Sequence, residues 1–122
     1  MQIFTGIDIV ENRRIEKTVD KFGNKFLNRI YTKRELEYCY KKKEYIQCLA
    51  SRFACKEAVI KAFFQAFNQK LFFKQIEILG KYGLPAEILL HLEKSPSKKF
   101  QISISISHEN TYSVASAIIV VY

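Results

Sequence analysis

Glu57 and Lys61 carry side chains that could do chemistry, and their spacing brings them together. Four residues apart on a helix, they would lie on one face with about 5–6 Å between Cβ atoms. Glu57 also interrupts an otherwise apolar row at helical spacing, so its carboxylate needs a metal ion or a proton-transfer role. The simpler interpretation is a helical ion pair at the edge of a core. The apolar members of the row are Phe53, Ile60 and Phe64.

Asp8 is a second acidic residue in an apolar setting, because Ile7, Ile9 and Val10 surround it in a segment typical of a strand. A charge inside such a strand is disfavoured unless it is paired or bound to a cation. Asp8 and Glu57 could together hold one Mg²⁺ through carboxylate oxygens, leaving positions for water and a phosphate. The alternative is that Asp8 ends the strand and caps the following helix.

Periodicity, capping signals and turn residues predict the elements that must position these side chains. Gly6 suggests a bulge or a close backbone approach, Asn12 a helix N-cap, and Thr32 with Glu35 a capping box. The pattern predicts an α+β fold with mainly antiparallel strands. We expect a strand over 2–10, helices over 12–21, about 26–31 and 33–40, a long helix from about 46 to 64 or a little beyond, and strands over 71–79, 86–92, 100–107 and 112–122.

The length of 122 residues predicts a single domain over residues 1–122. No apolar run approaches the ~20 residues that cross a bilayer, and the N-terminus has no basic segment typical of a signal peptide. Three cysteines without CxxC spacing favour reduced thiols in a cytoplasmic protein over a disulfide framework or a zinc site. These cysteines are Cys39, Cys48 and Cys55.

Positive charge is concentrated in residues 12–43, which carry eleven basic and four acidic residues of a chain with net charge +8. Such a field accelerates association with an acidic partner, whether nucleic acid, an anionic membrane surface or an acidic protein. A solvated helical face is the simpler alternative. Ten Phe and seven Tyr residues would also permit a basic nucleic-acid-binding module without catalysis, although no standard RNA-binding motif is present.

Several short motifs occur together along the chain: Gly6-Ile7-Asp8-Ile9-Val10-Glu11, Arg14-Ile15, Arg52-Phe53-Ala54-Cys55-Lys56-Glu57-Ala58, Lys61-Ala62, Phe73-Lys74-Gln75-Ile76-Glu77-Ile78 and Ser105-Ile106-Ser107-His108. Their order and spacing resemble holo-acyl-carrier-protein synthase, the short single-domain class of 4′-phosphopantetheinyl transferases. The resemblance covers the whole chain.

The resemblance implies transfer of 4′-phosphopantetheine from coenzyme A to a serine of apo-acyl carrier protein, with release of adenosine 3′,5′-bisphosphate, in support of fatty acid biosynthesis. Asp8 and Glu57 match the family's Mg²⁺ ligands, and the metal holds the coenzyme A pyrophosphate. Lys61 matches the lysine that neutralises or protonates the leaving phosphate. Glu57, directly or through a metal-bound water, matches the base for the serine hydroxyl.

The resemblance also implies a homotrimer with sites at subunit interfaces. Arg52 and His108 match positions that contact coenzyme A phosphates from a neighbouring subunit, and Gly83 and Pro85 belong to a turn near those phosphates. By its sequence context alone, His108 is a turn histidine at the end of a hairpin.

An acidic acyl carrier protein would be the partner of the basic segment. Arg14 matches the arginine that meets the carrier from the first helix, and Lys25 and Arg29 lie where the family presents further basic residues. The chain departs from the family where Phe64-Gln65-Ala66 replaces a Gly-Thr-Gly turn and where the Gly-Lys-Pro turn reads Gly83-Leu84-Pro85. A carrier-binding protein that has lost catalysis is therefore a further alternative.

Overall fold

A three-stranded antiparallel sheet forms one layer of the computed structural model, which describes residues 1–80 and 84–122. Its strands are β1 (Gln2–Glu11), β5 (Tyr112–Val121) and β4 (Phe100–His108), in that spatial order, so β1 and β4 are the edges. The isoleucine–serine alternation expected near the C-terminus is present in β4, where the isoleucines are half-buried and the serines are exposed.

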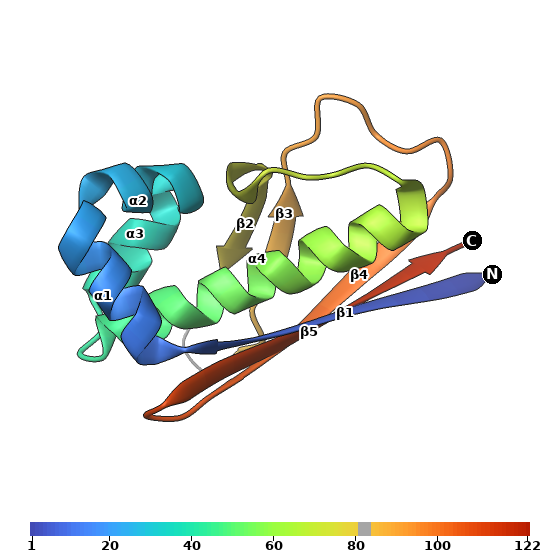
Figure 1. The fold of residues 1–122 in the computed structure, drawn as a ribbon. Helices are drawn as coiled ribbons and strands as arrows, with labels where there is room; N and C mark the ends of the chain where they lie inside the picture. Colours follow the sequence, from blue (N-terminus) through green and yellow to red (C-terminus); the bar gives the residue numbers. More distant parts are fainter. Residues whose placement is uncertain (81–83) are drawn as a thin grey trace.

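The long helix α4 (Tyr45–Phe67) packs along one face of this sheet (Figure 1). A Cβ atom at Gly6 of β1 would lie 2.0 Å from the carbonyl oxygen of Ala58, so only glycine permits this approach. The expected close backbone contact is confirmed, and the alternative of a bulge is wrong because Gly6 pairs in register with Ala117. None of the described helices combines the length and the apolar character needed to cross a bilayer.

Three short helices gather near the beginning of α4 (Figure 1). Gly23 has φ of +54° and separates the first two, and the expected capping box between Thr32 and Glu35 opens the third. These helices carry much of the basic segment, which places its charges at one end of the molecule. They are α1 (Asn12–Phe22), α2 (Asn24–Ile30) and α3 (Lys33–Tyr40).

The α+β fold class is confirmed, but the strand expected over residues 71–79 is only partly present. Its first half contains a 3₁₀ turn, η1 (Phe73–Gln75), because the Gln75 side chain accepts a hydrogen bond from the Phe72 backbone N–H at 2.8 Å. The remainder is β2 (Ile76–Leu79), which pairs with β3 (Glu87–Leu90). These two strands form a separate small sheet beside α4 (Figure 1).

Asn12 does not serve as the N-cap expected from the sequence. Glu11 occupies the N-cap position without a side-chain hydrogen bond, and Asn12 is the first residue of α1. The Asn12 side chain instead donates hydrogen bonds to the carbonyl oxygens of Glu109 and Asn110, in the turn between β4 and β5. The Asn12 side chain therefore makes tertiary hydrogen bonds instead of capping the helix.

The prediction of three reduced thiols is wrong in the structure, where Cys39 and Cys48 form a disulfide and Cys55 is a buried free thiol. The bridge joins α3 to α4 across the turn between them, with 5.5 Å between the two Cα atoms. Sequence spacing without a CxxC motif gave no sign of this pairing, because it depends on the angle at which α3 returns against α4.

Removing this disulfide by Cys48→Ser should lower the free energy of unfolding by about 2–3 kcal/mol, because the bridge closes a short loop in the unfolded chain. Urea unfolding with and without a dithiol reductant measures the effect: the reductant should destabilise the parent protein and leave Cys48→Ser unchanged. Alkylation after denaturation without reductant should label Cys55 alone. Labelling of all three cysteines would contradict the disulfide.

Candidate active site

Asp8 of β1 and Lys61 of α4 lie against each other at the edge of the sheet. Asp8 is on the face of β1 that packs on α4, since it shares the side of Gly6 and Val10. Lys61 Nζ lies 3.3 Å from Asp8 Oδ1 and donates a hydrogen bond to the carbonyl oxygen of Ile7 at 3.0 Å. The interpretation of Asp8 as a helix cap is therefore wrong, and Lys61 pairs with Asp8 rather than along its helix with Glu57.

Glu57 lies on the same side of α4, one helical turn before Lys61, at the half-buried edge of the core. Burial raises the pKa of Glu57, and the nearby Asp8 charge raises it further, while Lys61 and Lys70 oppose that shift. The two carboxylates are thus close enough to repel each other. A cation between them would relieve that repulsion.

A cavity of about 220 Å³ opens in front of the carboxylate pair. Its walls include Asp8 and Glu57 together with Arg14 from α1 and Phe53 from α4. Among residues 1–80 and 84–122, no cluster of three or more potential ligands is present. Two hard carboxylates beside an open cavity fit Mg²⁺, which usually takes one or two protein carboxylates and fills its other positions with water and phosphate oxygens.

Arg52 and His108 meet at a second, separate cavity of about 330 Å³. Only 8% of Arg52 is exposed, its guanidinium stacks on the Tyr38 ring at 4.5 Å, and its Nε has no hydrogen-bond partner within the described part of the chain. Lys42 also lies over Tyr38, at 4.8 Å, and Lys43 lines the same cavity. This cluster of cations with an unpaired buried donor has the chemistry of a phosphate-binding site.

The two cavities have no lining residue in common. Asp8 belongs to one edge strand of the sheet and His108 to the other edge strand, with β5 between them. The structure therefore brings Asp8, Glu57 and Lys61 together, and it brings Arg52 and His108 together, but one chain does not join the two groups.

Basic residues of α1 and α2 surround an apolar hollow next to the carboxylate cavity. Lys25 and Arg29 line a cavity of about 320 Å³ together with the exposed ring of Phe22. Thr18 and Phe26 line both this cavity and the one that holds Asp8 and Glu57, so the two are neighbours. Arg14 faces the carboxylate cavity itself.

Comparison with known proteins shows the family to which this chain belongs. Residues 5–117 match the profile described as the "4'-phosphopantetheinyl transferase superfamily". This chain belongs to that superfamily. The assignment favours a transferase over the alternative of a nucleic-acid-binding module without catalysis.

The individual relatives agree with this membership in the transferase superfamily. A holo-[acyl-carrier-protein] synthase of Aquifex aeolicus is 51% identical over 116 residues, which cover 93% of this chain and 95% of the relative. A holo-(acyl-carrier-protein) synthase of Bacillus anthracis, solved in complex with coenzyme A (3′,5′-ADP), is 30% identical with a TM-score of 0.77 over 95% of this chain and 94% of its own. The ACPS–CoA complex of Chronobacterium ammoniagenes shares the fold, with a TM-score of 0.84 at 22% identity and coverage of 100% and 99% of the two chains.

The segment that departs from the transferase pattern is ordered as helix. α4 continues to Phe67, where the rings of Phe63, Phe67 and Phe100 pack together, and Asn68 ends the helix with a left-handed φ of 53°. Asn68 thus does what a C-terminal glycine does in other helices. The backbone conformation of a Gly-Thr-Gly turn is absent at residues 64–66.

The structure does not place two residues implied by the family resemblance at these cavities, and it reveals two cavity residues that the sequence did not indicate. Gly83 lies outside the described residues, and the exposed Pro85 lines none of the cavities described above. Lys70 was missed by the sequence patterns, although it lines a cavity of about 470 Å³ with Lys61, and its charge opposes the rise that burial causes in the pKa of Glu57. Tyr38 was missed as well, since nothing in its sequence context shows that two cations stack on its ring.

Proposed function

We propose that this transferase moves 4′-phosphopantetheine from coenzyme A to a serine of apo-acyl carrier protein and releases adenosine 3′,5′-bisphosphate. The observation that carries the proposal is the convergence of Asp8 and Glu57 at a cavity that adjoins a basic, partly apolar docking surface, with Lys61 in contact with Asp8. The relatives' names and the coenzyme A bound to the Bacillus anthracis protein support the same donor and acceptor. Residues 1–122 form one transferase domain in this proposal.

Asp8 and Glu57 would hold Mg²⁺, which supplies positive charge to the coenzyme A pyrophosphate when bound. Lys61 places its ammonium group beside Asp8, where it can neutralise the phosphate that leaves. Glu57 has a raised pKa and lies in the same cavity, so its carboxylate is suited to take the proton of the attacking serine hydroxyl. The transfer itself requires the serine oxygen to attack the phosphorus in line with the leaving oxygen.

Arg52 and His108 would bind a second phosphate of coenzyme A, and they would do so for a neighbouring subunit. The support is Arg52 Nε, which has no hydrogen-bond partner among residues 1–80 and 84–122, and the separation of this cavity from the carboxylates of the same chain. If the β4 edge of one copy meets the β1 edge of the next, both groups face one substrate. A repeated head-to-tail contact closes into a ring when the rotation between successive copies returns to the first copy, and a trimer is the ring we propose.

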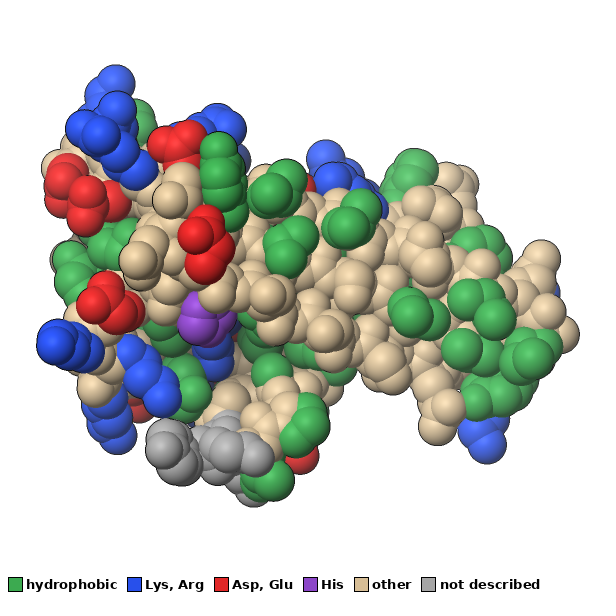
Figure 2. Space-filling view, turned by 90° about the horizontal axis from the view of Figure 1, so that it is seen from below, with side chains coloured by type: hydrophobic (Ala, Val, Ile, Leu, Met, Phe, Trp, Pro, Cys, Tyr) green, Lys and Arg blue, Asp and Glu red, His purple; other side chains and the backbone are tan. Residues whose placement is uncertain are grey.

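The sheet face opposite α4 supports such an assembly. Ile7 and Ile9 of β1 are 66% and 63% exposed, and Ile3 and Ile118 are exposed on the same face. Figure 2 views the molecule from this side and shows apolar side chains (green) spread over it. Burial of this apolar surface would favour association, by about 25 cal/mol for each Å² removed from water. Sedimentation should give three copies per particle, and a monomer that transfers at full rate would contradict the ring.

The assay that tests the reaction combines the protein with apo-acyl carrier protein, coenzyme A and Mg²⁺. Mass spectrometry should show phosphopantetheine added to the carrier serine, and addition should require Mg²⁺. A carrier whose serine is replaced by alanine provides the control. Failure to modify any carrier protein from the same cell would refute the proposal. We place this reaction in the cytoplasm and assign it to fatty acid biosynthesis, where acyl carrier protein is used.

Reversal of charge at the docking surface should impair recognition of the carrier more than chemistry. In the variant Lys25→Glu with Arg29→Glu, we expect the KM for the acidic carrier to rise about tenfold while kcat changes less than about twofold, because these exposed charges lie outside the carboxylate cavity and mainly set encounter and orientation. The difference should shrink at high salt. Lys94→Glu with Lys98→Glu, in an exposed loop, is the control with the same change in net charge, and an equal effect there would show that net charge alone acts.

A further inference from the structure

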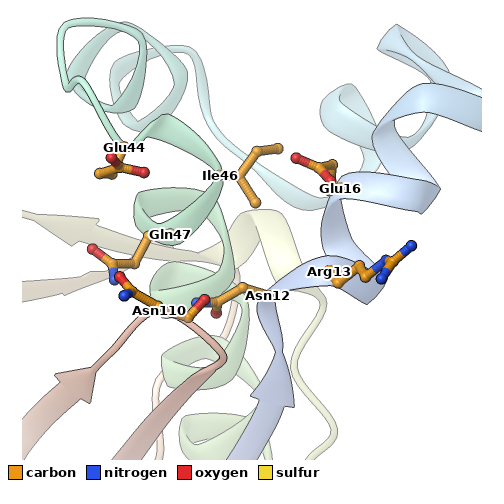
Figure 3. Close-up of a pocket in the computed structure, with 7 residues that line it drawn as sticks. All are labelled: Asn12, Arg13, Glu16, Glu44, Ile46, Gln47 and Asn110. Atoms are coloured by element: carbon orange, nitrogen blue, oxygen red, sulfur yellow. The ribbon is translucent and has the colours of Figure 1, made fainter.

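Asn12 is a buried polar residue at the point where β1 ends and α1 begins, with only 6% of its surface exposed. Figure 3 shows its side chain beside Gln47 of α4 and Asn110 of the β4–β5 turn. Asn12 Nδ2 donates hydrogen bonds to the carbonyl oxygens of Glu109, at 2.8 Å, and of Asn110, at 3.1 Å. The Asn12 backbone N–H donates a third to the carbonyl oxygen of Thr111 at 2.8 Å.

The side-chain oxygen of Asn12 is also hydrogen-bonded. Ser113 Oγ donates a hydrogen bond to Asn12 Oδ1 at 2.7 Å, and Ser113 is the residue of β5 that pairs with His108. Ser51 Oγ lies 3.3 Å from Ser113 Oγ, and Ser51 directly precedes Arg52 on α4. Ser51 and Ser113 are both fully buried. A continuous polar network therefore runs from Asn12 to the position before Arg52 and passes directly beside His108.

We propose that Asn12 is a positioning residue for the nucleotide-phosphate half of the site: it fixes the turn that follows His108 and keeps His108 in place relative to Arg52. This inference rests on the proposed contact of those two residues with a coenzyme A phosphate. Asn12 does not touch the substrate in this assignment and acts through the turn.

The turn needs such an anchor because its local hydrogen bonds fix its conformation but do not attach it to the neighbouring helices. Glu109 Oε1 accepts hydrogen bonds from the backbone N–H groups of Thr111 in the turn and of Tyr112 at the start of β5. Contacts that tie the turn to the rest of the protein come from Asn12 and from Gln47, whose Nε2 donates to the carbonyl oxygen of Glu109 at 2.9 Å. His108 is exposed at the end of an edge strand, so few packing contacts would replace them.

Asn12→Asp is a sharp test because it keeps the shape of the side chain but replaces two N–H donors with an acceptor that faces two carbonyl oxygens. We expect the Kd for coenzyme A, measured by calorimetry on the assembled protein, and the KM for coenzyme A each to rise about tenfold. The kcat should change less than about twofold, and the KM for the carrier should stay constant. A general loss of structure would move all four quantities.

Asn110→Asp is the matched control, since it adds the same charge to the same turn through an exposed side chain and leaves the Asn110 carbonyl in place. Its effect on coenzyme A binding should stay below about threefold. In a His108→Ala background, Asn12→Asp should add less than about twofold, because residues that act through one contact are not additive. Ser113→Ala removes one bond of the network and serves as the second variant should Asn12→Asp fail to fold, with an expected rise of about threefold.

Equal effects of Asn12→Asp and Asn110→Asp, or an effect that persists fully in His108→Ala, would overturn the inference. The proposed function fails separately, if the parent protein neither binds coenzyme A nor modifies the carrier. If the parent is active and His108→Ala leaves coenzyme A binding unchanged, the phosphate contact and the role of Asn12 are both refuted while the reaction stands.

Discussion

Asp8→Asn and Glu57→Gln should each lower kcat at least about a thousandfold and abolish the stimulation by Mg²⁺. Either change removes one of the two carboxylates that face the cavity between β1 and α4, and among the described residues no third carboxylate, His or Cys completes a metal cluster there. Both substitutions preserve side-chain size. The measurement is transfer to apo-acyl carrier protein across a Mg²⁺ titration, together with Mg²⁺ affinity from calorimetry.

Glu87→Gln is the control for the loss of one carboxylate, since Glu87 is exposed on β3 and lines none of the cavities. It should leave kcat and the Mg²⁺ dependence unchanged. A variant of Asp8 or Glu57 that retains near-parental kcat would refute the assignment of that residue as a ligand. Glu57→Gln could also remove the base, and a pH profile that loses one limb while Mg²⁺ affinity is retained would separate these roles.

Lys56→Met should lower the free energy of unfolding by about 3–5 kcal/mol, because it leaves a buried carboxylate without its partner. Lys56 and Glu35 are both fully buried, with Lys56 Nζ 2.6 Å from Glu35 Oε1. Lys56 also donates to the carbonyl oxygens of Ile30 and Phe73, while Glu35 accepts from the backbone N–H of Ile78. One ion pair thus ties α2, α3, η1 and β2 to α4, and burial lowers the pKa of Lys56.

Urea unfolding measures this loss, and Lys74→Met, at an exposed position of η1, is the control with little expected change. The double variant Lys56→Met with Glu35→Leu should recover part of the stability, because no charge is then left buried. Additive losses in the double variant would show that the ion pair itself is not the cause. The pair lies next to Glu57 in the chain, so a partial loss of activity through displaced catalytic groups is expected as well.

Two helix predictions that depend on residues within four positions of each other were confirmed. A spacing of four residues placed Glu57 and Lys61 on one side of α4, and the capping box at Thr32 opens α3 as expected. The end of α4 was less predictable. Phe64-Gln65-Ala66 has no glycine to stop a helix, and its extension to Phe67 depends on aromatic packing against Phe100.

Contacts between residues far apart in the chain could not be predicted from sequence spacing. Lys61 was interpreted first as the ionic partner of Glu57, but the approach of β1 to α4 at Gly6 puts Asp8 within 3.3 Å of it. Asn12 was expected to cap α1, yet the β4–β5 turn takes its amide. The Cys39–Cys48 disulfide likewise depends on how α3 returns against α4.

The residue types of the site, the helix face that presents Glu57 and Lys61, the α+β class and the family resemblance could all be predicted from the sequence, because these follow from local periodicity and from motifs in order. Which of those residues meet depends on the fold. The order β1-β5-β4 puts Asp8 and His108 on opposite edges of one sheet, so the carboxylates and the Arg52–His108 cluster line different cavities. Strand order and helix approach depend on packing between segments far apart in the chain, and no local pattern encodes them.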